Sequence, residues 1–160
     1  GLRTLQFGEQ LDALLGPIRA KSRELDAQAG RNVPLLVKIA PDMSEEEVAL
    51  VAGSIARNEL DGVIATNTTV SRDAVSDDPQ AQEAGGLSGK PVFEASNTVI
   101  RLLRAHLPTL PIIGVGGIDS GEAAKAKMAA GADLVQLYSG LIYQGPALVQ
   151  QCAKALKQGE

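Results

Sequence analysis

Two junctions in the sequence combine residue types that suit the binding of an anion. Gly116-Gly117 follows the apolar run 112–115, and Tyr138-Ser139 follows the apolar run 134–137. Glycine between a strand and a helix lets the backbone approach a ligand, and the start of the helix offers free N–H groups. Two such junctions roughly twenty residues apart resemble the phosphate site after strands 7 and 8 of a (β/α)8 barrel. We predict that the two junctions together form a phosphate-binding site. For either junction alone, the alternative is that its small residues allow tight packing between strand and helix.

Lys38 interrupts an otherwise apolar segment near its carboxyl end. Lysine is seldom buried without a partner, because removing its charge from water costs several kcal/mol. We interpret Lys38 as a cation directed at an anionic ligand or at a developing negative charge. An ion pair with a carboxylate such as Asp42 is the alternative.

Polar residues also follow the next apolar segment, where Thr66-Asn67-Thr68-Thr69 succeeds residues 62–65. Asparagine offers both a donor and an acceptor, which suits an amide or imide edge, although it also suits a turn. The glycine-rich stretch 85–89, which contains Ser88 and Gly89, ends a polar connection of more than twenty residues. A connection of that length in a compact domain is usually functional.

The elements that must position these residues follow from the apolar periodicity. Helices are expected at about 8–28, 45–58, 91–106, 119–130 and 145–157, and strands at about 34–40, 62–66, 111–116 and 134–138. Ser44 and Glu47 form a predicted capping box. Pro17 marks either a kink in the first helix or a later start near that residue.

Four strand–helix units with buried, parallel-type strands predict an α/β fold. Eight strands close a (β/α)8 TIM barrel of roughly 250 residues, so we expect the 160 residues to supply the C-terminal half, strands 5 to 8 and their helices. On this interpretation residues 1–160 belong to one domain whose N-terminal half is absent from the chain. An open flavodoxin-like sheet is the alternative.

Composition excludes several classes of function. The net charge is −4, the basic residues are scattered and aromatic residues make up 2%, so no nucleic-acid surface is expected. No apolar run reaches the ~18 residues of a membrane span. The single histidine, His106, allows neither a Ser/His/Asp arrangement nor a metal-ligand cluster, so no metal ligand is assigned.

Five motifs taken together closely resemble the quinone-dependent, class 2 dihydroorotate dehydrogenases. Their sequences and positions are VKIAPD at 37–42, IATNTT at 64–69, GGLSGKP at 85–91, IIGVGGI at 112–118 and LYSG at 137–140. They occur in the order and at the spacings of that family. Gly89-Lys90-Pro91 directly after Gly-Gly-Leu-Ser favours class 2 over the soluble classes.

The resemblance implies an FMN enzyme that oxidises dihydroorotate to orotate in pyrimidine synthesis, with a quinone as electron acceptor. It implies that Lys38 and Thr66 lie at the flavin and that Asn67 and Thr68 bind the pyrimidine substrate. The residues implied to line the flavin or hold the FMN phosphate are Ser88, Gly89, Gly116, Gly117, Tyr138 and Ser139.

The resemblance also implies what the chain lacks. The serine that serves as catalytic base in class 2 is expected before Gly1, together with the first four strands and the helices that dock on the membrane. The complete protein is then expected on the cytoplasmic face of a bacterial inner membrane, and the 160 residues alone are expected to be inactive. Two alternatives are a flavin-free, phosphate-binding TIM-barrel isomerase or lyase, and a non-catalytic half-barrel that binds a phosphorylated ligand.

Overall fold

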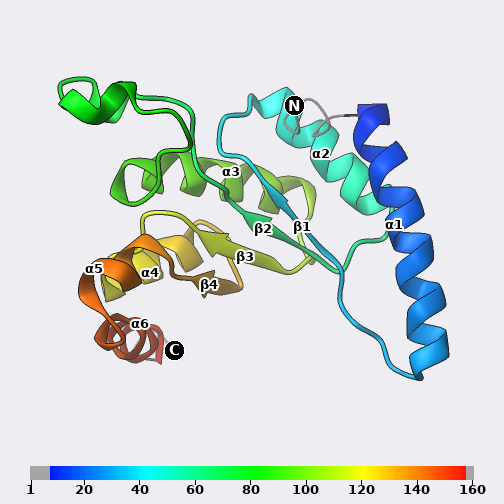
Figure 1. Cartoon of the computed structure of the whole chain (residues 1–160). Coiled ribbons are helices and arrows are strands. Elements are labelled where there is room, and N and C mark those ends of the chain that lie inside the picture. The colour runs from blue at the N-terminus through cyan, green and yellow to red at the C-terminus, as the bar shows by residue number, and fades with distance from the viewer. Residues whose placement is uncertain (1–7, 158–160) are drawn as a thin grey trace.

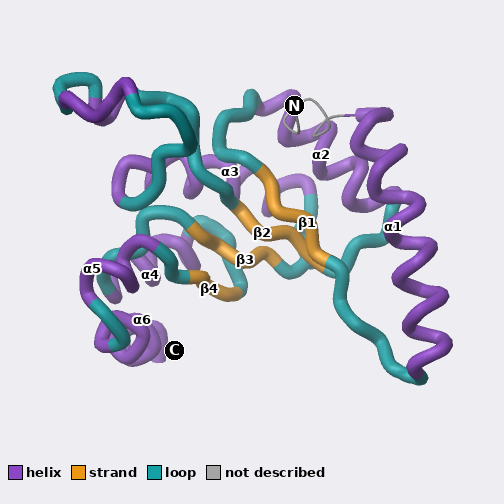
Figure 2. Tube along the Cα trace, in the orientation of Figure 1, coloured by secondary structure: helices purple, strands orange, loops and turns teal. Residues whose placement is uncertain are grey.

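The sheet at the centre of the fold has four parallel strands in the order β1-β2-β3-β4 (Figures 1 and 2). A computed structural model describes residues 8–157. The strands are β1 (Leu36–Ile39), β2 (Gly62–Ala65), β3 (Ile112–Val115) and β4 (Leu134–Gln136). The helices are α1 (Gly8–Ala29), α2 (Glu45–Arg57), α3 (Phe93–His106), α4 (Gly121–Ala129), α5 (Ser139–Gln144) and α6 (Ala147–Lys157), with short 3-10 turns η2 (Asp73–Val75), η3 (Pro79–Gln82) and η4 (Lys90–Val92).

The strand order decides between the two predicted architectures. A doubly wound sheet reverses its order at a switch point, whereas these four strands follow one another in chain order. The flavodoxin-like alternative is therefore wrong. The α/β class is confirmed, and the sheet corresponds to four consecutive strands of a (β/α)8 barrel.

The hydrophobic core lies between one face of the sheet and the helices. Alternate strand residues such as Ile39, Val63 and Ile112 point into it and are almost completely buried. They meet the apolar faces of α2 and α3, including Val51 and Leu103. Burying each such side chain stabilises the fold by about 1.5–3 kcal/mol. Lys38 alternates with these core residues, so its side chain lies on the opposite face of the sheet.

Two predicted features of the first helices can be judged directly. The capping box of α2 is confirmed, because Ser44 Oγ accepts from the Glu47 N–H at 3.2 Å and a Glu47 carboxylate oxygen accepts from the Ser44 N–H at 2.7 Å. The late start of the first helix is wrong, since α1 runs unbroken from Gly8 through Pro17 to Ala29. Pro17 is exposed at the surface of α1.

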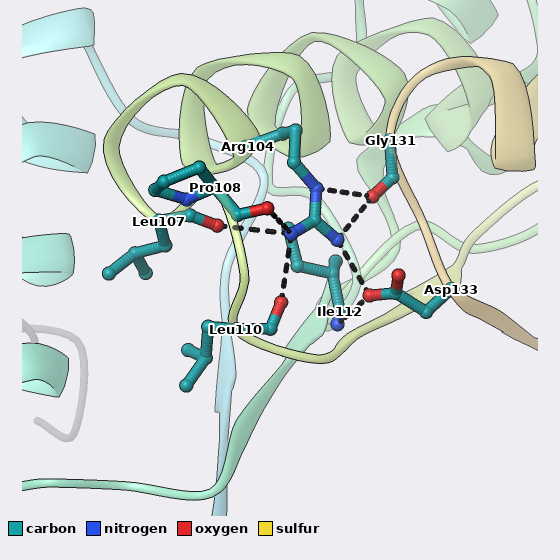
Figure 3. Close-up of polar contacts among 7 residues, drawn as sticks. All are labelled: Arg104, Leu107, Pro108, Leu110, Ile112, Gly131 and Asp133. Carbon is teal, nitrogen blue, oxygen red and sulfur yellow. Dashed lines mark hydrogen bonds and ion pairs between the residues drawn. The ribbon is translucent and has the colours of Figure 1, made fainter.

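The turns before β2 and β4 share one arrangement. Asp133 precedes β4; its carboxylate accepts from the Ile112 N–H at 2.7 Å and from Arg104 of α3 at 2.6 Å (Figure 3). Asp61 precedes β2 and likewise accepts from the Leu35 N–H at 2.7 Å and from Arg19 of α1 at 2.8 Å. Each carboxylate thus ties the start of the preceding strand to the helix before it. These ties lie at the amino ends of the strands, away from the polar residues that follow them.

Arg104 is the most connected of these groups. Its guanidinium also donates to the backbone carbonyls of Leu107, Pro108, Leu110 and Gly131 at 2.8–3.0 Å (Figure 3). One side chain therefore fixes both the α3–β3 and the α4–β4 connections.

No helix in the described part of the chain is long and apolar enough to cross a membrane.

Candidate functional site

The polar residues that follow the strands gather around one cavity at the carboxyl ends of the sheet. This strand-end cavity has a volume of about 520 Å³, within the range of small-molecule sites. All ten residues singled out from the sequence line it: Lys38, Thr66, Asn67, Thr68, Ser88, Gly89, Gly116, Gly117, Tyr138 and Ser139. They come from five stretches of chain separated by up to a hundred residues, and the parallel sheet brings their ends to one edge.

The turn at Gly116-Gly117 has the geometry of an anion cradle. Both glycines have positive φ, +118° and +72°, a region that other residues rarely adopt. A Cβ on Gly117 would lie 2.5 Å from Phe93 Cβ and 2.9 Å from Phe93 Cα, so the turn rests directly on the first residue of α3. In the described part of the chain, neither glycine N–H has a hydrogen-bond acceptor. The turn therefore presents unpaired donors at the cavity wall, which suits a phosphate.

Backbone hydrogen bonds to the neighbouring strands fix the segment that follows β2. The Thr66 N–H donates to the Val115 carbonyl at 2.9 Å, and the Asn67 N–H donates to the Ile39 carbonyl at 2.7 Å. Asn67 Oδ1 accepts from the Thr68 N–H at 2.9 Å. This oxygen therefore stabilises the local turn, as the alternative interpretation of Asn67 predicted. The Asn67 amide nitrogen has no partner among the described residues. It remains as a donor beside the cavity.

The long connection between β2 and α3 is folded back over this segment. Thr69 pairs with Leu87 in an antiparallel bridge, and its hydroxyl donates to the Asp42 carboxylate. Gly86 lies so close to Thr68 that a Cβ on it would overlap the threonine side chain. Arg72 donates to six backbone carbonyls between residues 69 and 85. The connection is thus an ordered flap whose shape depends on one arginine.

Lys38 extends from β1 toward the strand-end cavity and forms no ion pair with Asp42. Asp42 instead accepts from Thr69 and from the Val70 N–H, the latter at 3.0 Å. The alternative interpretation of Lys38 is therefore wrong. At the cavity rim, Lys90 Nζ lies 3.7 Å from an Asp119 carboxylate oxygen; the lysine side chain is largely exposed and the aspartate side chain partly exposed.

Several residues of the site escaped prediction. Gln136, Tyr143 and Gln144 line the cavity; the last two belong to α5, a six-residue helix too short to show periodicity. Lys127 of α4 is completely buried behind the Gly116-Gly117 turn. Burial lowers the pKa of Lys127 to about 8, and the nearby Glu94 carboxylate opposes this shift. The sequence contains one indication that Lys127 is buried: Gly114, a glycine inside β3, leaves room for the lysine stem.

Comparison with known proteins agrees with this geometry. The family profile described as "Dihydroorotate dehydrogenase" matches residues 1–159. Proteins of Burkholderia mallei strain SAVP1 and Burkholderia pseudomallei strain 668, both named "Dihydroorotate dehydrogenase (quinone)", are 59% identical over 160 and 159 residues. Each match covers 99% of this chain and 46% of the relative, so the chain spans about half the length of these curated relatives.

Two solved structures are also similar. DHODH from Eimeria tenella in complex with ferulenol superposes with a TM-score of 0.91 and 30% sequence identity, covering 98% of this chain and 45% of that one. The ligand-free DHODH from the same organism gives 0.89 and 33%, covering 98% and 46%. With a family profile that spans almost the whole sequence, the chain belongs to the dihydroorotate dehydrogenase family.

Proposed function

We propose that this chain supplies the cofactor-binding half of a quinone-dependent dihydroorotate dehydrogenase, which oxidises dihydroorotate to orotate in pyrimidine synthesis. The observation that carries the proposal is the convergence of ten residues from five separate motifs on one cavity. The 59% identity to proteins named for this reaction supports the quinone as acceptor. Residues 1–160 would then be the C-terminal half of one FMN-binding barrel domain.

The residues around the cavity fit FMN. Gly116 and Gly117 present unpaired N–H donors and leave no room for side chains, so a phosphate would lie against the turn with Tyr138 and Ser139 on its other side. Lys38, on the sheet face that points into the cavity, would lie at the flavin ring. Its positive charge would stabilise negative charge there. FMN, when bound, would supply the acceptor for the two electrons of the oxidation.

The remaining residues divide between flavin and substrate. Thr66 is buried at the end of β2 and would contact the flavin edge, while Ser88 and Gly89 would line the ring from the returning end of the flap. Asn67 and Thr68 would bind the pyrimidine, since the Asn67 amide nitrogen can donate to an imide or carboxylate oxygen. We assign no catalytic base within the chain, because the family resemblance locates that serine before Gly1.

The proposal includes partners outside these residues. The N-terminal half of the barrel would close the cavity over the flavin. Helices that precede that half would admit quinone from the membrane. The complete enzyme would then be peripheral on the cytoplasmic face of a bacterial inner membrane. The 160 residues alone would bind FMN weakly and turn over no substrate, because half of the barrel core is missing.

An anaerobic absorbance titration of the protein at its full natural length tests the proposal. Adding dihydroorotate should bleach the oxidised flavin band, and a soluble quinone analogue should restore it. Bleaching that fumarate or NAD reverses and quinone does not would overturn the assignment of the acceptor. A colourless protein that takes up no added FMN would overturn the flavin assignment and favour the phosphate-binding isomerase or lyase.

A further inference from the structure

Lys127 is the largest fully buried side chain in the described part of the chain. Its stem runs along β3 at Gly114, where an added Cβ would lie 2.5 Å from Lys127 Cγ. Its ammonium group donates to Ser96 Oγ at 3.0 Å and lies 4.7 Å from the centre of the Phe93 ring. The cation is therefore held by a hydroxyl and an aromatic face, both from the first turn of α3.

This environment does not balance the charge. No carboxylate forms an ion pair with Lys127 among residues 8–157. The first turn of α3 is also the positive end of a helix dipole, which disfavours a nearby cation. Glu94 in the same turn acts on Lys127 only at a distance, and burial outweighs it. A buried lysine is almost always paired, so the surroundings call for a further negative charge.

The two groups that hold the ammonium also support the Gly116-Gly117 turn. Ser96 Oγ donates to the Val115 carbonyl at 2.7 Å, and it would lie 3.3 Å from a Cβ on Gly116. Gly117 rests on the backbone of Phe93. The lysine charge thus lies directly behind the turn, on the side away from the strand-end cavity. An anion bound to the glycine N–H groups would face it across one layer of protein.

We propose that Lys127 supplies, from behind the Gly116-Gly117 turn, the buried positive charge that balances the phosphate of the bound cofactor. The inference rests on the proposed function, since it takes the anion at that turn to be the FMN phosphate. Lys127 does not touch the ligand and acts through the low-dielectric layer between them. Two opposite charges separated by one layer of protein, where the dielectric constant is low, interact strongly enough to change an affinity at least about tenfold.

The test compares FMN with riboflavin, which has the same ring and no phosphate. Both are titrated into the flavin-free protein at its full natural length, and flavin fluorescence gives the two dissociation constants. Lys127→Met keeps the apolar stem and removes the charge, so FMN should bind about tenfold more weakly while riboflavin binds as before. Lys125→Met is the matched control: it lies two residues away on the same helix, pairs with Glu122 at the surface and should leave both affinities unchanged.

Two results would overturn the inference alone: a Lys127→Met variant that still prefers FMN as strongly as the wild type, or one that loses both flavins equally. The second would show that Lys127 only supports packing. If the wild-type protein bound FMN and riboflavin with equal affinity, the proposed phosphate-binding site would be wrong, and the inference about Lys127 would fail with it.

The wild-type protein offers a second measurement in case Lys127→Met does not fold. Lys127 is charged below its pKa of about 8 and loses that charge as the pH rises. The FMN-over-riboflavin preference should therefore fall between about pH 7 and about pH 9.5. Gly114, which packs on the lysine stem, carries no titratable group, and Glu94 is the charged group that acts on Lys127 from the first turn of α3. A flat preference over this range would overturn the inference.

Discussion

Ser139 Oγ donates a hydrogen bond to Ser88 Oγ at 2.9 Å and so joins two segments that are 51 residues apart in the chain. Ser88 belongs to the glycine-rich end of the flap, and Ser139 is the first residue of α5. Both side chains line the strand-end cavity. The bond therefore closes the cavity rim between the part proposed for the flavin ring and the part proposed for the phosphate.

A double-mutant cycle should reveal this coupling. A hydrogen bond of this kind contributes about 0.5–1.5 kcal/mol net, so Ser88→Ala or Ser139→Ala should each weaken FMN binding about two- to tenfold. The double variant should lose little more FMN affinity than the single variant that binds FMN less tightly, because each substitution breaks the same bond. Fluorescence titration measures the affinities, and Ser76→Ala, on the exposed outer part of the flap, is the control. Fully additive losses would contradict the coupling.

Gly117 and Gly145 form a matched pair for testing the phosphate turn. Their φ angles are +72° and +69°, but a Cβ on Gly117 would overlap Phe93 whereas one on Gly145 meets nothing within 4 Å. Alanine at either position costs about 1–2 kcal/mol for the left-handed backbone. Gly117→Ala should in addition displace the turn and abolish measurable FMN binding, while Gly145→Ala should retain it. Equal FMN affinity in the two variants would show that the turn is not the binding element.

The Arg104 cluster predicts a large loss of stability without a direct loss of chemistry. Arg104→Met removes every bond drawn in Figure 3 except that between Asp133 and the Ile112 N–H. Leaving several part-buried carbonyls unpaired should lower the free energy of unfolding by about 2–4 kcal/mol. Urea denaturation measures this change. Arg101→Met on the exposed side of the same helix, where one bond to Thr98 is lost, should cost less than about 0.5 kcal/mol.

Asp61 makes stability depend on pH in a defined direction. The Leu35 N–H and then the Arg19 guanidinium hold the pKa of Asp61 below its ordinary value of 3.8. A carboxylate with a depressed folded-state pKa stabilises the fold above the unfolded-state pKa, and this contribution is lost as the pH falls through the folded-state value. Asp61→Asn should therefore flatten the decline in unfolding free energy below about pH 4. Asp77→Asn, which removes one carboxylate from the exposed flap, is the control. Equal slopes in all three proteins would contradict the role of Asp61.

Much of the fold was predictable because its strands are short apolar runs with polar residues at one end. Lys38 lies one residue before the end of β1 and Gly116-Gly117 directly after β3, and parallel strands must bring such ends together. The capping box at Ser44 was predictable for a similar reason, since it involves residues three positions apart. These signals are local in the sequence, and the sheet topology converts them into one cavity.

The parts that escaped prediction depend on contacts that are distant in sequence. Lys127 lies in an alanine-rich helix two residues from the surface lysine Lys125, and nothing local distinguishes the two. Only Gly114, thirteen residues earlier on a neighbouring strand, creates the space that buries it. Pro17 wrongly suggested a late start, because proline disfavours a helix interior by local rules, yet α1 contains it.

Arg72 offers a test of the flap and of the substrate assignment. Its six bonds to backbone carbonyls hold the flap between residues 69 and 85 in shape, and this brings Gly86 against Thr68. Thr68 and Asn67 are the proposed substrate residues, whereas the phosphate turn lies on another loop. Loss of Arg72 should therefore disturb the substrate more than the cofactor.

We expect Arg72→Met, in the protein at its full natural length, to raise the KM for dihydroorotate about tenfold, since small misplacements of positioning groups have effects of this size. FMN affinity should change less than about twofold, because the bonds of Arg72 stop at Gly85 and none reaches a residue proposed to bind the flavin or its phosphate. Steady-state kinetics and flavin titration of the same preparations separate the two effects, with Arg101→Met as the control. If FMN affinity and KM deteriorated together, Arg72 would also hold Ser88 and Gly89 at the flavin, and Asn67 and Thr68 would lose their separate assignment to the substrate.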